Sequence, residues 1–440
     1  MKRIISANTP EEKEANEMLD DLQHDAFNFF LHETNPENGL VLDGTWEDSP
    51  SSIAAVGFGF AVLPVGVERG WMSRDEAVER TWVTLRFFAN SPQGPEPDTL
   101  GYQGFYYHFL NEDTGQRTWN CEISTIDTTI LIAGMLVSAQ YFDDDDSSGE
   151  REIRELADQL YRRVNWNWAQ AGELTVRHGW LPESGFLDHH WQGYDEALLL
   201  YILGLGSPDH PLPPESFRAY TSTYRWQKLY GYELLHAAPL FVHQFSHIWI
   251  DFRGIQDEFM RAHGIDYFEN SRRATYVQQQ HAIQNPYHFE GYGEFDWGIT
   301  ASEGPVQGSE PVQADGHTFY GYLARGVPEP DDGTLSPWTV IAALPFAPEI
   351  ALPTIKYIGE TFPQLSGEYG LKCSLNPSFP GDTQESRGWF SENYYGLNEG
   401  PIVLTIENYR SDLIWRLMKQ CRPVIEGLRK AGFQRGWLNR

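Results

Sequence analysis

The feature that most constrains this chain is a helical periodicity of apolar residues that recurs from one end to the other. Alternating apolar and polar patterns, which are typical of half-buried strands, are scarce. The sequence therefore predicts an all-α fold. The expected helices cover residues 14–31, 52–69, 73–90, 124–142, 150–166, 194–205, 239–251, 257–280, 337–343 and 405–430.

Long linkers rich in Gly, Asn, Pro and aromatic residues lie between the expected helices. Loops of this length inside a compact domain are usually functional. Together with about ten to twelve helices they predict a closed ring of helical hairpins with the site on the long-loop side. No Pro/Ser-rich linker divides the 440 residues, so we expect one catalytic domain over 1–440, with residues 1–12 as an N-terminal tail.

The charge balance excludes some partners. The formal net charge is −30 and the sequence pI is about 4.7. A surface this acidic repels phosphate backbones and anionic lipids, so we expect no nucleic-acid partner and no membrane. The first residues contain no apolar core of signal-peptide length. We therefore expect a soluble, cytoplasmic monomer as the chain stands, or a periplasmic or secreted protein if a leader was removed.

Several chemistries lack their sequence signatures. The three cysteines are widely spaced, with no Cys-x-x-Cys pair. No Gly-x-Ser-x-Gly elbow and no glycine pattern of a phosphate or dinucleotide loop is present. We therefore expect no cofactor and no metal.

Aromatic residues are unusually frequent in the polar linkers. The C–H faces of a sugar stack on Trp and Tyr, and Gln and Arg side chains can bind its hydroxyls. This composition favours a carbohydrate ligand, although the rings could instead pack the loops onto the helix ends. Tyr287 is one such loop ring. The predicted substrate-binding residues of this kind are Trp46, Gln103, Tyr106, Trp191, Tyr194, Trp297, Trp389 and Tyr394.

Carboxylates cluster at the starts of two expected helices. Glu122 and Asp127 flank the start of the helix at 124–142, and Asp195 and Glu196 open the helix that follows Trp191. Acids in a first helical turn are favoured by the macrodipole, and Ser124 and Asp127 fit the Ser/Thr-x-x-acid capping pattern, so a purely structural role is an alternative. The functional interpretation is a pair of carboxyl groups across a cleft, with Glu196 as the acid and Asp127 or Glu122 directing water.

A third group of polar residues lies in the expected helix at 239–251. His243, His247 and Asp251 are spaced four apart and would share one face, next to Gln244 and Arg253. Metal ligation, buried structural pairing and hydrogen bonding to a substrate are all compatible with this spacing. We predict that His243, Gln244 and Arg253 bind substrate.

Strings spread over nearly the whole chain resemble a known family in the same order. They include Ser-Ile-Ala-Ala-Val-Gly-Phe-Gly at 52–59, Glu-Ile-Ser-Thr-Ile-Asp at 122–127, Gly-Tyr-Asp-Glu-Ala at 193–197, His-Gln-Phe-Ser-His at 243–247 and Ile-Glu-Asn-Tyr-Arg at 406–410. In these strings the chain resembles the bacterial glycoamylase-like family, which contains the endo-β-1,2-glucanases.

The resemblance implies an (α/α)6 toroid that hydrolyses β-1,2-glucan to sophorose-series oligosaccharides, mostly by endo-cleavage and with inversion at the anomeric carbon. By position, Glu196 is similar to the family's essential acid, with Glu122 and Asp127 facing it. A water relay would allow Glu399 or Glu407 to be the base. Exo-release of sophorose, glucosyl transfer and a non-hydrolytic glucan-binding protein remain alternatives. The expected partner is a β-glucan or glucooligosaccharide substrate.

Overall fold

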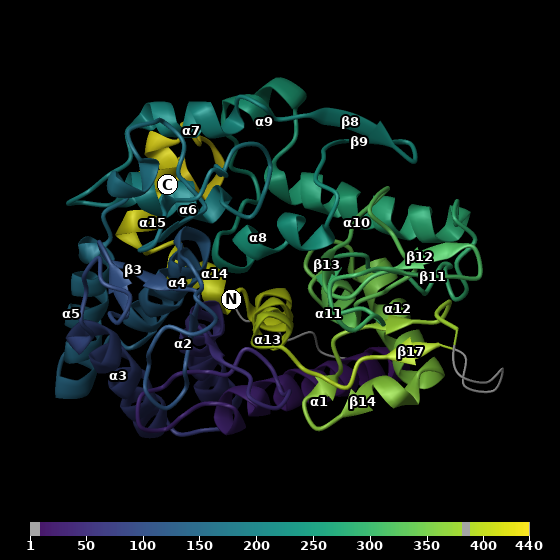
Figure 1. The fold of residues 1–440 in the computed structure, drawn as a ribbon, viewed down its shortest axis with the longest axis horizontal. Coiled ribbons are helices and arrows are strands. Elements are labelled where there is room, and N and C mark those ends of the chain that lie inside the picture. The colour runs from purple at the N-terminus through teal and green to yellow at the C-terminus, as the bar shows by residue number, and fades with distance from the viewer. Residues whose placement is uncertain (1–8, 381–387, 440) are drawn as a thin grey trace. The chain divides into compact units, whose positions relative to one another are not determined.

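The computed structural model describes residues 9–380 and 388–439. The chain divides into two compact units. Unit 1 comprises residues 1–28, 225–245 and 268–411, and unit 2 comprises 29–224, 246–267 and 412–440. Each unit is built mainly of helices, as Figure 1 shows, which confirms the predicted helical class. Short strands, which the sequence did not predict, fix many of the loops.

Unit 2 contains a group of packed helices and a small sheet. The strands are short and pair in the antiparallel order β2-β3-β5-β6-β7, with β1 on β4. The helices are α2 (Ile53–Arg69), α3 (Arg74–Asn90), α4 (Thr125–Tyr141), α5 (Ser148–Arg163), α6 (Leu198–Gly206), α7 (Pro214–Thr221), α8 (Phe245–Trp249), α9 (Glu258–His263), α14 (Leu413–Met418) and α15 (Arg422–Lys430). The strands are β1 (Ser51–Ser52), β2 (Gly101–Tyr102), β3 (Phe105–Tyr107), β4 (Phe109–Leu110), β5 (Ile123–Ser124), β6 (Gly179–Leu181) and β7 (Gly185–Phe186).

Unit 1 combines helices with two-stranded antiparallel hairpins. Its helices are most of α1 (Pro10–His32), α10 (Tyr267–Gln284), α11 (Pro337–Ile341), α12 (Pro348–Thr361) and α13 (Gly396–Ser411). Its strand pairs are β8 (Trp226–Leu229) with β9 (Tyr232–Leu235), β10 (Ala301–Ser302) with β13 (Leu323–Ala324), β11 (Val312–Ala314) with β12 (His317–Phe319), β14 (Ser366–Gly367) with β15 (Gly370–Leu371), and β16 (Leu375–Asn376) with β17 (Trp389–Phe390).

Three of the predicted helices are interrupted in the structure, and the helix expected at 194–205 begins only at Leu198. The segment 239–251 forms a 3-10 turn (Leu240–His243) and then the short α8, because the chain leaves helical geometry at Gln244. The segment 257–280 is two helices, separated where Gly264 caps α9 with a positive φ. The segment 405–430 divides into α13, α14 and α15, with Asp412 in the left-handed region. Of the expected tail, residues 1–8 lie outside the described residues, and α1 already begins at Pro10.

The core of unit 2 is formed by helices that are buried on all sides. Residues 53–66 of α2 and every residue of α6 are buried, and most of α4 is buried as well. α2 and α4 lie side by side in Figure 1, and both begin at a serine N-cap that follows a strand residue. These Ser caps fix where each helix starts and therefore where its first-turn side chains lie. None of the helices within 9–380 and 388–439 is long and apolar enough to span a bilayer.

Glycines allow α2 and α4 to approach backbone to backbone. A Cβ atom at Gly134 would lie 1.9 Å from the Gly57 carbonyl oxygen. We expect Gly134→Ala to destabilise the protein by about 1–3 kcal/mol, because backbone cannot yield as a side chain can. Gly359→Ala in α12, where a Cβ would meet nothing within 4 Å, is the matched control and should stabilise by about 0.5–1 kcal/mol. Thermal unfolding of the two variants measures the contrast, and equal shifts in Tm would contradict the close-packing argument.

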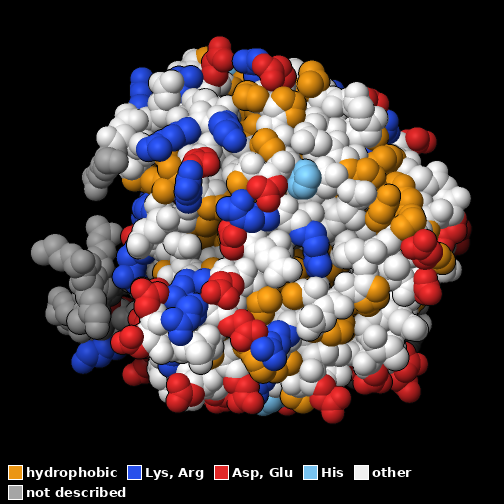
Figure 2. Space-filling model, turned by 90° about the vertical axis from the view of Figure 1, so that its left-hand side faces the viewer, with side chains coloured by type: hydrophobic (Ala, Val, Ile, Leu, Met, Phe, Trp, Pro, Cys, Tyr) orange, Lys and Arg blue, Asp and Glu red, His pale blue; other side chains and the backbone are white. Residues whose placement is uncertain are grey.

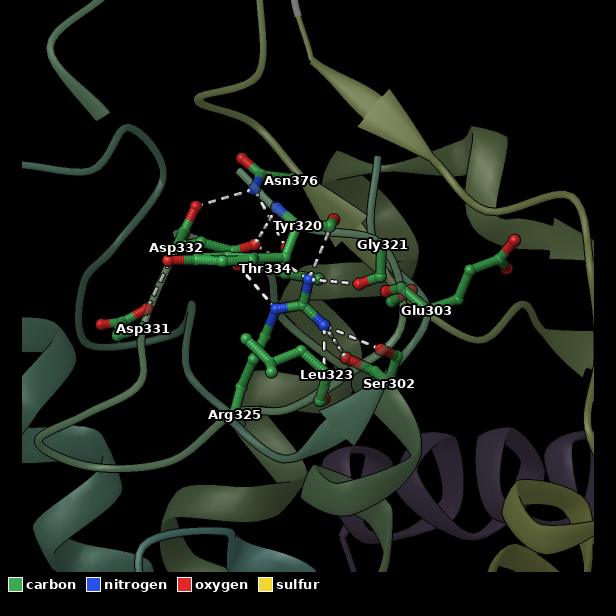
Figure 3. Close-up of polar contacts among 12 residues, drawn as sticks. Ser302, Glu303, Tyr320, Gly321, Leu323, Arg325, Asp331, Asp332, Thr334 and Asn376 are labelled. Carbon is green, nitrogen blue, oxygen red and sulfur yellow. Dashed lines mark hydrogen bonds and ion pairs between the residues drawn. The ribbon is translucent and has the colours of Figure 1, made fainter. Parts of the chain in front are cut away.

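A buried arginine organises the loops of unit 1. Arg325 has no exposed side-chain surface and pairs with Asp332, Nε to Oδ1 at 2.6 Å and Nη2 to Oδ2 at 2.8 Å. Its remaining N–H groups donate to the carbonyls of Ser302 at 2.7 Å and Gly321 at 2.8 Å. Figure 3 shows the guanidinium at the centre of these contacts. The ion pair therefore fixes the segments around 302, 321 and 332 to one another.

Basic side chains at the surface are largely paired with acids. Arg162 in α5 pairs with Asp158 at 2.7 Å and with Asp209 at 3.1 Å. Arg86 in α3 pairs with Glu152 in α5 at 2.7 Å. On the face shown in Figure 2, Lys and Arg side chains lie interspersed with Asp and Glu. Exposed pairs of this kind contribute about 0–1 kcal/mol each, so they have little influence on the fold.

All three thiols lie in the interior. Cys121 and Cys421 belong to unit 2 and Cys373 to unit 1, and each is a free cysteine. Burial raises the pKa of the Cys121 and Cys373 thiols to about 11 and that of Cys421 to about 12. At neutral pH the three groups are therefore uncharged thiols that pack as small apolar side chains.

Candidate active site

The pairing of two short strands places a histidine beside a carboxylate. β3 and β5 run antiparallel with Tyr107 opposite Ile123, so the next positions along the ladder are His108 and Glu122. The His108 backbone N–H donates to the Glu122 carbonyl at 3.0 Å. The His108 Nδ1 atom also lies 3.0 Å from Glu122 Oε1. The sheet thus joins two side chains that the sequence analysis did not connect.

Asp127 reaches the same imidazole from the first turn of α4. Its backbone N–H donates to the Ser124 hydroxyl oxygen at 3.2 Å, and that hydroxyl donates a short hydrogen bond to Asp127 Oδ2. The capping contact predicted between Ser124 and Asp127 is therefore confirmed. Asp127 Oδ2 also lies 3.5 Å from His108 Nε2. Asp127 therefore makes the structural capping contact with Ser124 and also lies beside the His108 ring.

A cationic imidazole holds these carboxylates together. Burial alone would lower the pKa of His108, but Asp127, Glu122 and Asp43 outweigh it and raise that pKa to about 9. Burial also disfavours ionisation of Glu122, yet the hydrogen bond and the charge of His108 bring its pKa below the usual range. At neutral pH the site therefore contains an imidazolium beside an ionised Glu122.

Asp43 is a member of this cluster that the sequence analysis missed. It follows Leu42 in a loop whose backbone is held by the Asp43 N–H donating to the Pro50 carbonyl at 2.7 Å. Burial and the nearby Asp127 raise the pKa of Asp43 to about 7, although His108 opposes this shift. The sequence signal was weak: an acid between an apolar triplet and Gly44, three residues before the predicted Trp46. We call Asp43, His108, Glu122 and Asp127 the His108 cluster.

Glu196 lies in the turn that precedes α6. The Ser246 hydroxyl donates to the Glu196 carbonyl oxygen at 3.2 Å and fixes the turn. The side chain is partly exposed. Burial of the carboxyl group, followed by the negative charge of Asp127, raises the pKa of Glu196 to about 7. No salt bridge among the described residues involves Glu196, so no arginine fixes it in the ionised form.

The neighbouring Asp195 has a different local role. Its Oδ1 accepts a hydrogen bond from the Ala197 backbone N–H at 3.0 Å, at the entry to α6. Burial, together with the adjacent Glu196, raises the pKa of Asp195 well above its usual range. Because the two acids lie in one turn, the pair retains a proton at a pH where an isolated carboxyl group would be ionised.

The carboxyl groups of this site differ in their protonation state at neutral pH. Glu122 is held ionised by His108, whereas Glu196 retains a proton up to neutral pH. Environments that drive the pKa values of nearby carboxyl groups apart are characteristic of acid–base assignments at active sites. Because the charge of Asp127 raises the pKa of Glu196, the His108 cluster is electrostatically coupled to the Glu196 turn.

Four predicted substrate-binding residues are interior side chains. Tyr106, His243, Gln244 and Trp297 are each at most 1% exposed. Gln244 Nε2 donates to the Thr339 carbonyl at 2.7 Å, and Trp297 Nε1 donates to Thr354 Oγ1 at 2.9 Å. Side chains that are enclosed and internally bonded in this way favour the packing alternative over a sugar contact.

The His243, His247 and Asp251 face does not exist, because the helix at 239–251 is interrupted. His243 Nε2 lies 3.2 Å from the Ala237 carbonyl oxygen. Burial lowers the pKa of His247 to about 3. Asp251 Oδ1 accepts from Arg253 Nε at 2.7 Å, and Lys419 makes a short ion pair with the same carboxylate. The observed contacts are those of buried structural pairing.

The remaining predicted ligands are in varied settings. Trp191 is 7% exposed, stacks on His178 at 3.7 Å between ring centroids, and donates from Nε1 to Thr125 Oγ1 at 2.9 Å. It therefore packs against the first residue of α4. Tyr394 is buried in unit 1. Four others are partly exposed: Trp46, Gln103, Tyr194 and Trp389.

The two distant carboxylates considered as bases are both buried in α13. Glu407 accepts from Gln23 Nε2 at 3.1 Å and from the Ser411 hydroxyl at 2.5 Å. Glu399 has no exposed surface, and within 9–380 and 388–439 neither of its carboxyl oxygens has a hydrogen-bond partner. Burial, with Asp25 nearby, raises the pKa of Glu399 well above its usual range. A carboxyl group that keeps its proton cannot accept one from water, which argues against Glu399 as the base.

The described residues also contain no group of three or more His, Cys, Asp or Glu side chains placed to hold a metal ion. The His108 cluster has the required residue types, but His108 itself contacts Glu122 through a hydrogen bond and lies within ion-pair distance of Asp127.

A model of the family named Glycoamylase, described as "Putative glucoamylase", matches residues 188–422, which is more than half of the chain. The chain belongs to the Glycoamylase family. This match includes the Glu196 turn. It also covers the unit 1 segments from β8 to α13, and the resemblance expected from the sequence is confirmed at family level.

Similar proteins include enzymes that act on β-1,2-glucans. An exo β-1,2-glucooligosaccharide sophorohydrolase of Parabacteroides distasonis is 25% identical over 94% of this chain, and the chain spans 57% of that relative's length. An endo-β-1,2-glucanase of Chitinophaga pinensis, solved with sophorotriose and glucose, is 26% identical with a TM-score of 0.84, covering 96% of this chain and 99% of the other. A Bacteroides uniformis protein bearing the same description as the family is 29% identical with a TM-score of 0.84, covering 97% of this chain and 99% of the other.

Proposed function

We propose that this member of the Glycoamylase family is a glycoside hydrolase that cleaves β-1,2-glucan with inversion at the anomeric carbon. The proposal rests on two carboxyl groups of unit 2 whose pKa values are shifted in opposite directions. Glu196 keeps its proton up to about neutral pH, and Glu122 is held ionised by His108. Acid-assisted hydrolysis of a glycosidic bond needs one group in each of these states.

In the proposed reaction Glu196 protonates the bridging oxygen between two glucosyl units. Because burial raises the pKa of this carboxyl group, the proton is available at a pH where an ordinary glutamate has lost it. The Ser246 contact with the Glu196 backbone keeps the turn in place while the proton leaves. Loss of the proton leaves a negative charge on Glu196. Because burial and Asp127 disfavour that charge, the carboxylate takes up a proton again after the reaction.

The water that attacks the anomeric carbon is directed by Asp127 or Glu122. His108 lies between the two carboxylates, with Nδ1 3.0 Å from Glu122 and Nε2 3.5 Å from Asp127, and it keeps Glu122 ionised. The Ser124 hydroxyl orients Asp127, so the first turn of α4 contributes geometry as well as charge. The cluster as a whole stabilises positive charge at the anomeric carbon in the transition state.

The proposal extends to the chain as a whole. We propose one catalytic (α/α)6 domain of helical hairpins and endo-cleavage, which is the activity in the name of the Chitinophaga relative. Exo-release of sophorose is the second candidate, because the Parabacteroides relative carries that activity in its name. A glucan-binding protein without hydrolytic activity is the alternative of another class.

A reducing-end assay over β-1,2-, β-1,3-, β-1,4- and α-1,4-glucans tests the function. We expect product from the β-1,2-linked polymer only. A ladder of sophorose-series oligosaccharides at early times indicates endo-cleavage, whereas sophorose alone indicates the exo mode. The anomer released first, read by proton NMR, reports inversion. Absence of product from every polymer would overturn the hydrolase proposal.

The pH profile follows from the two protonation states. Ionisation of Glu196 at a pKa of about 7 removes the catalytic proton, so kcat/KM should fall as the pH rises through neutrality. Glu122 has a lowered pKa and stays ionised well into the acid range, so the acid limb should lie below the usual range of glutamate. Initial rates on a sophorose-series oligosaccharide measure both limbs. Thermal unfolding at each pH is the control, and activity undiminished above pH ~9 would contradict the acid assignment.

A further inference from the structure

Unit 1 contains a pocket of about 510 Å³ that shares no residue with the His108 cluster or the Glu196 turn. Its volume falls in the range of small-molecule sites, ~300–1,000 Å³. Rings and an acid line it, namely Tyr287, Phe289, His317, Tyr320 and Glu329. We call it the Tyr287 pocket. Tyr287 is among the loop rings that the sequence analysis associated with carbohydrate.

The rings of the Tyr287 pocket form a connected surface. Phe289 lies 6.1 Å from Tyr287 and 4.7 Å from His317 between ring centroids. Phe289 is buried, whereas the other two rings are partly exposed. The Tyr287 hydroxyl donates to Glu329 Oε1 at 2.9 Å, so the exposed carboxylate and the ring are held together.

The floor of the pocket is rigid. The Asp331 side chain is fully enclosed, and its Oδ1 accepts from the Tyr292 hydroxyl at 2.6 Å and from the Gly333 N–H at 3.0 Å. Its Oδ2 lies 2.8 Å from His281 Nε2, and His281 Nδ1 lies 2.7 Å from the Tyr230 hydroxyl. The acid is thus occupied internally, and Glu329 is the carboxylate that faces a ligand.

The Arg325–Asp332 pair anchors the wall of the same pocket. Asp332 Oδ2 accepts from the Tyr320 backbone N–H at 3.1 Å, and Arg325 Nη2 donates to the Tyr320 carbonyl at 3.3 Å. Figure 3 shows Tyr320 and Asp331 on either side of Asp332, next to the guanidinium. The pocket is therefore formed before any ligand arrives, which lowers the ordering cost of binding.

The chemistry of the lining identifies the ligand class. None of the described residues that line the pocket is Lys or Arg, which disfavours an anion. Partly exposed rings suit the C–H faces of a pyranose, and the Glu329 carboxylate and the Thr318 hydroxyl, which both line the pocket, suit its hydroxyl groups. We propose that the Tyr287 pocket is an accessory saccharide site that holds glucosyl units of a β-1,2-glucan chain, an inference that rests on the proposed function for the identity of the sugar.

Affinity electrophoresis through gels containing β-1,2-glucan tests this proposal. The full chain carrying Glu196→Gln serves as the background, so that the polymer stays intact. Adding Tyr287→Ala, or separately Glu329→Gln, should weaken retention roughly fivefold or more, the equivalent of about 1 kcal/mol. Tyr322→Ala is the matched control, because this ring is 67% exposed and lies outside the pocket. Turnover of a short sophorose-series oligosaccharide by the otherwise native chain should stay within about twofold for all three substitutions.

The outcomes separate this proposal from the proposed function. Weaker retention in both pocket variants, with native retention in the Tyr322 variant, supports the accessory site even if the native chain hydrolyses no glucan. Unchanged retention in the pocket variants overturns the site and leaves the hydrolase proposal intact. Absence of retention in the background chain overturns the site whatever the hydrolysis assay gives. Circular dichroism of each variant confirms that retention is compared between folded chains.

Discussion

Glu196→Gln should reduce kcat for β-1,2-glucan roughly 10²–10⁴-fold, the range expected when a general acid is removed. The substitution keeps the shape of the side chain but cannot release a proton at neutral pH. KM should change little, because the side chain acts on the leaving oxygen and contributes little to ground-state binding. Reducing-end release under saturating substrate measures the effect, and a loss smaller than about tenfold would rule out Glu196 as the acid.

Two controls identify the acid among the neighbouring carboxyl groups. Asp195→Asn removes the second proton-bearing group of the same turn while retaining an acceptor for the Ala197 N–H. We expect it to lower kcat less than Glu196→Gln. An aryl β-glucoside with a strongly acidic phenol needs no proton on its leaving group, so the Gln variant should recover most of its rate on that substrate. If Asp195→Asn were the more damaging change, the roles of the two acids would be reversed.

Arg325→Met should destabilise unit 1 by about 3–5 kcal/mol, because it leaves the enclosed Asp332 carboxylate without a counter-charge. Both members of this pair have no exposed side-chain surface. The guanidinium also bonds to the Ser302 and Gly321 carbonyls, and a methionine offers no donor for them. Thermal unfolding followed by circular dichroism should show a large drop in Tm or loss of the folded chain during purification.

The size of this effect is judged against a surface pair and a double variant. Arg162→Met breaks ion pairs whose side chains are about half exposed, and should cost no more than about 1 kcal/mol. Arg325→Met with Asp332→Asn removes the unpaired charge while keeping a carbonyl acceptor for the Tyr320 N–H. We expect this double variant to be more stable than Arg325→Met alone. Equal stability of the two would show that lost packing, and not the buried charge, dominates.

Sequence reasoning was most successful where one local signal decided the structure. The starts of α2, α3 and α4 were each predicted to within one residue, because the helical periodicity of apolar residues begins directly after a serine N-cap. The helical class follows from the same signals. Ser124 and Asp127 were likewise paired correctly, since capping contacts depend only on residues three apart.

Features that depend on distant pairing could not be predicted in this way. His108 joins Glu122 through the β3–β5 ladder, and strands of two or three residues give no detectable alternation in sequence. The break at Gln244 and the left-handed Asp412 are backbone choices imposed by surroundings, so the long helices expected there were wrong. Burial of the predicted ligands could not be foreseen either, because nothing in a loop sequence distinguishes the enclosed Trp297 from the partly exposed Trp46.

The enclosed thiols have a consequence for how this protein ages in solution. Oxidants and alkylating reagents attack the thiolate, and each cysteine is both uncharged at neutral pH and buried, with at most 8% of its surface exposed. Covalent damage to sulfur must therefore wait for the surrounding core to open. Since Cys373 belongs to one unit and Cys121 and Cys421 to the other, the order in which they are modified records which unit opens first.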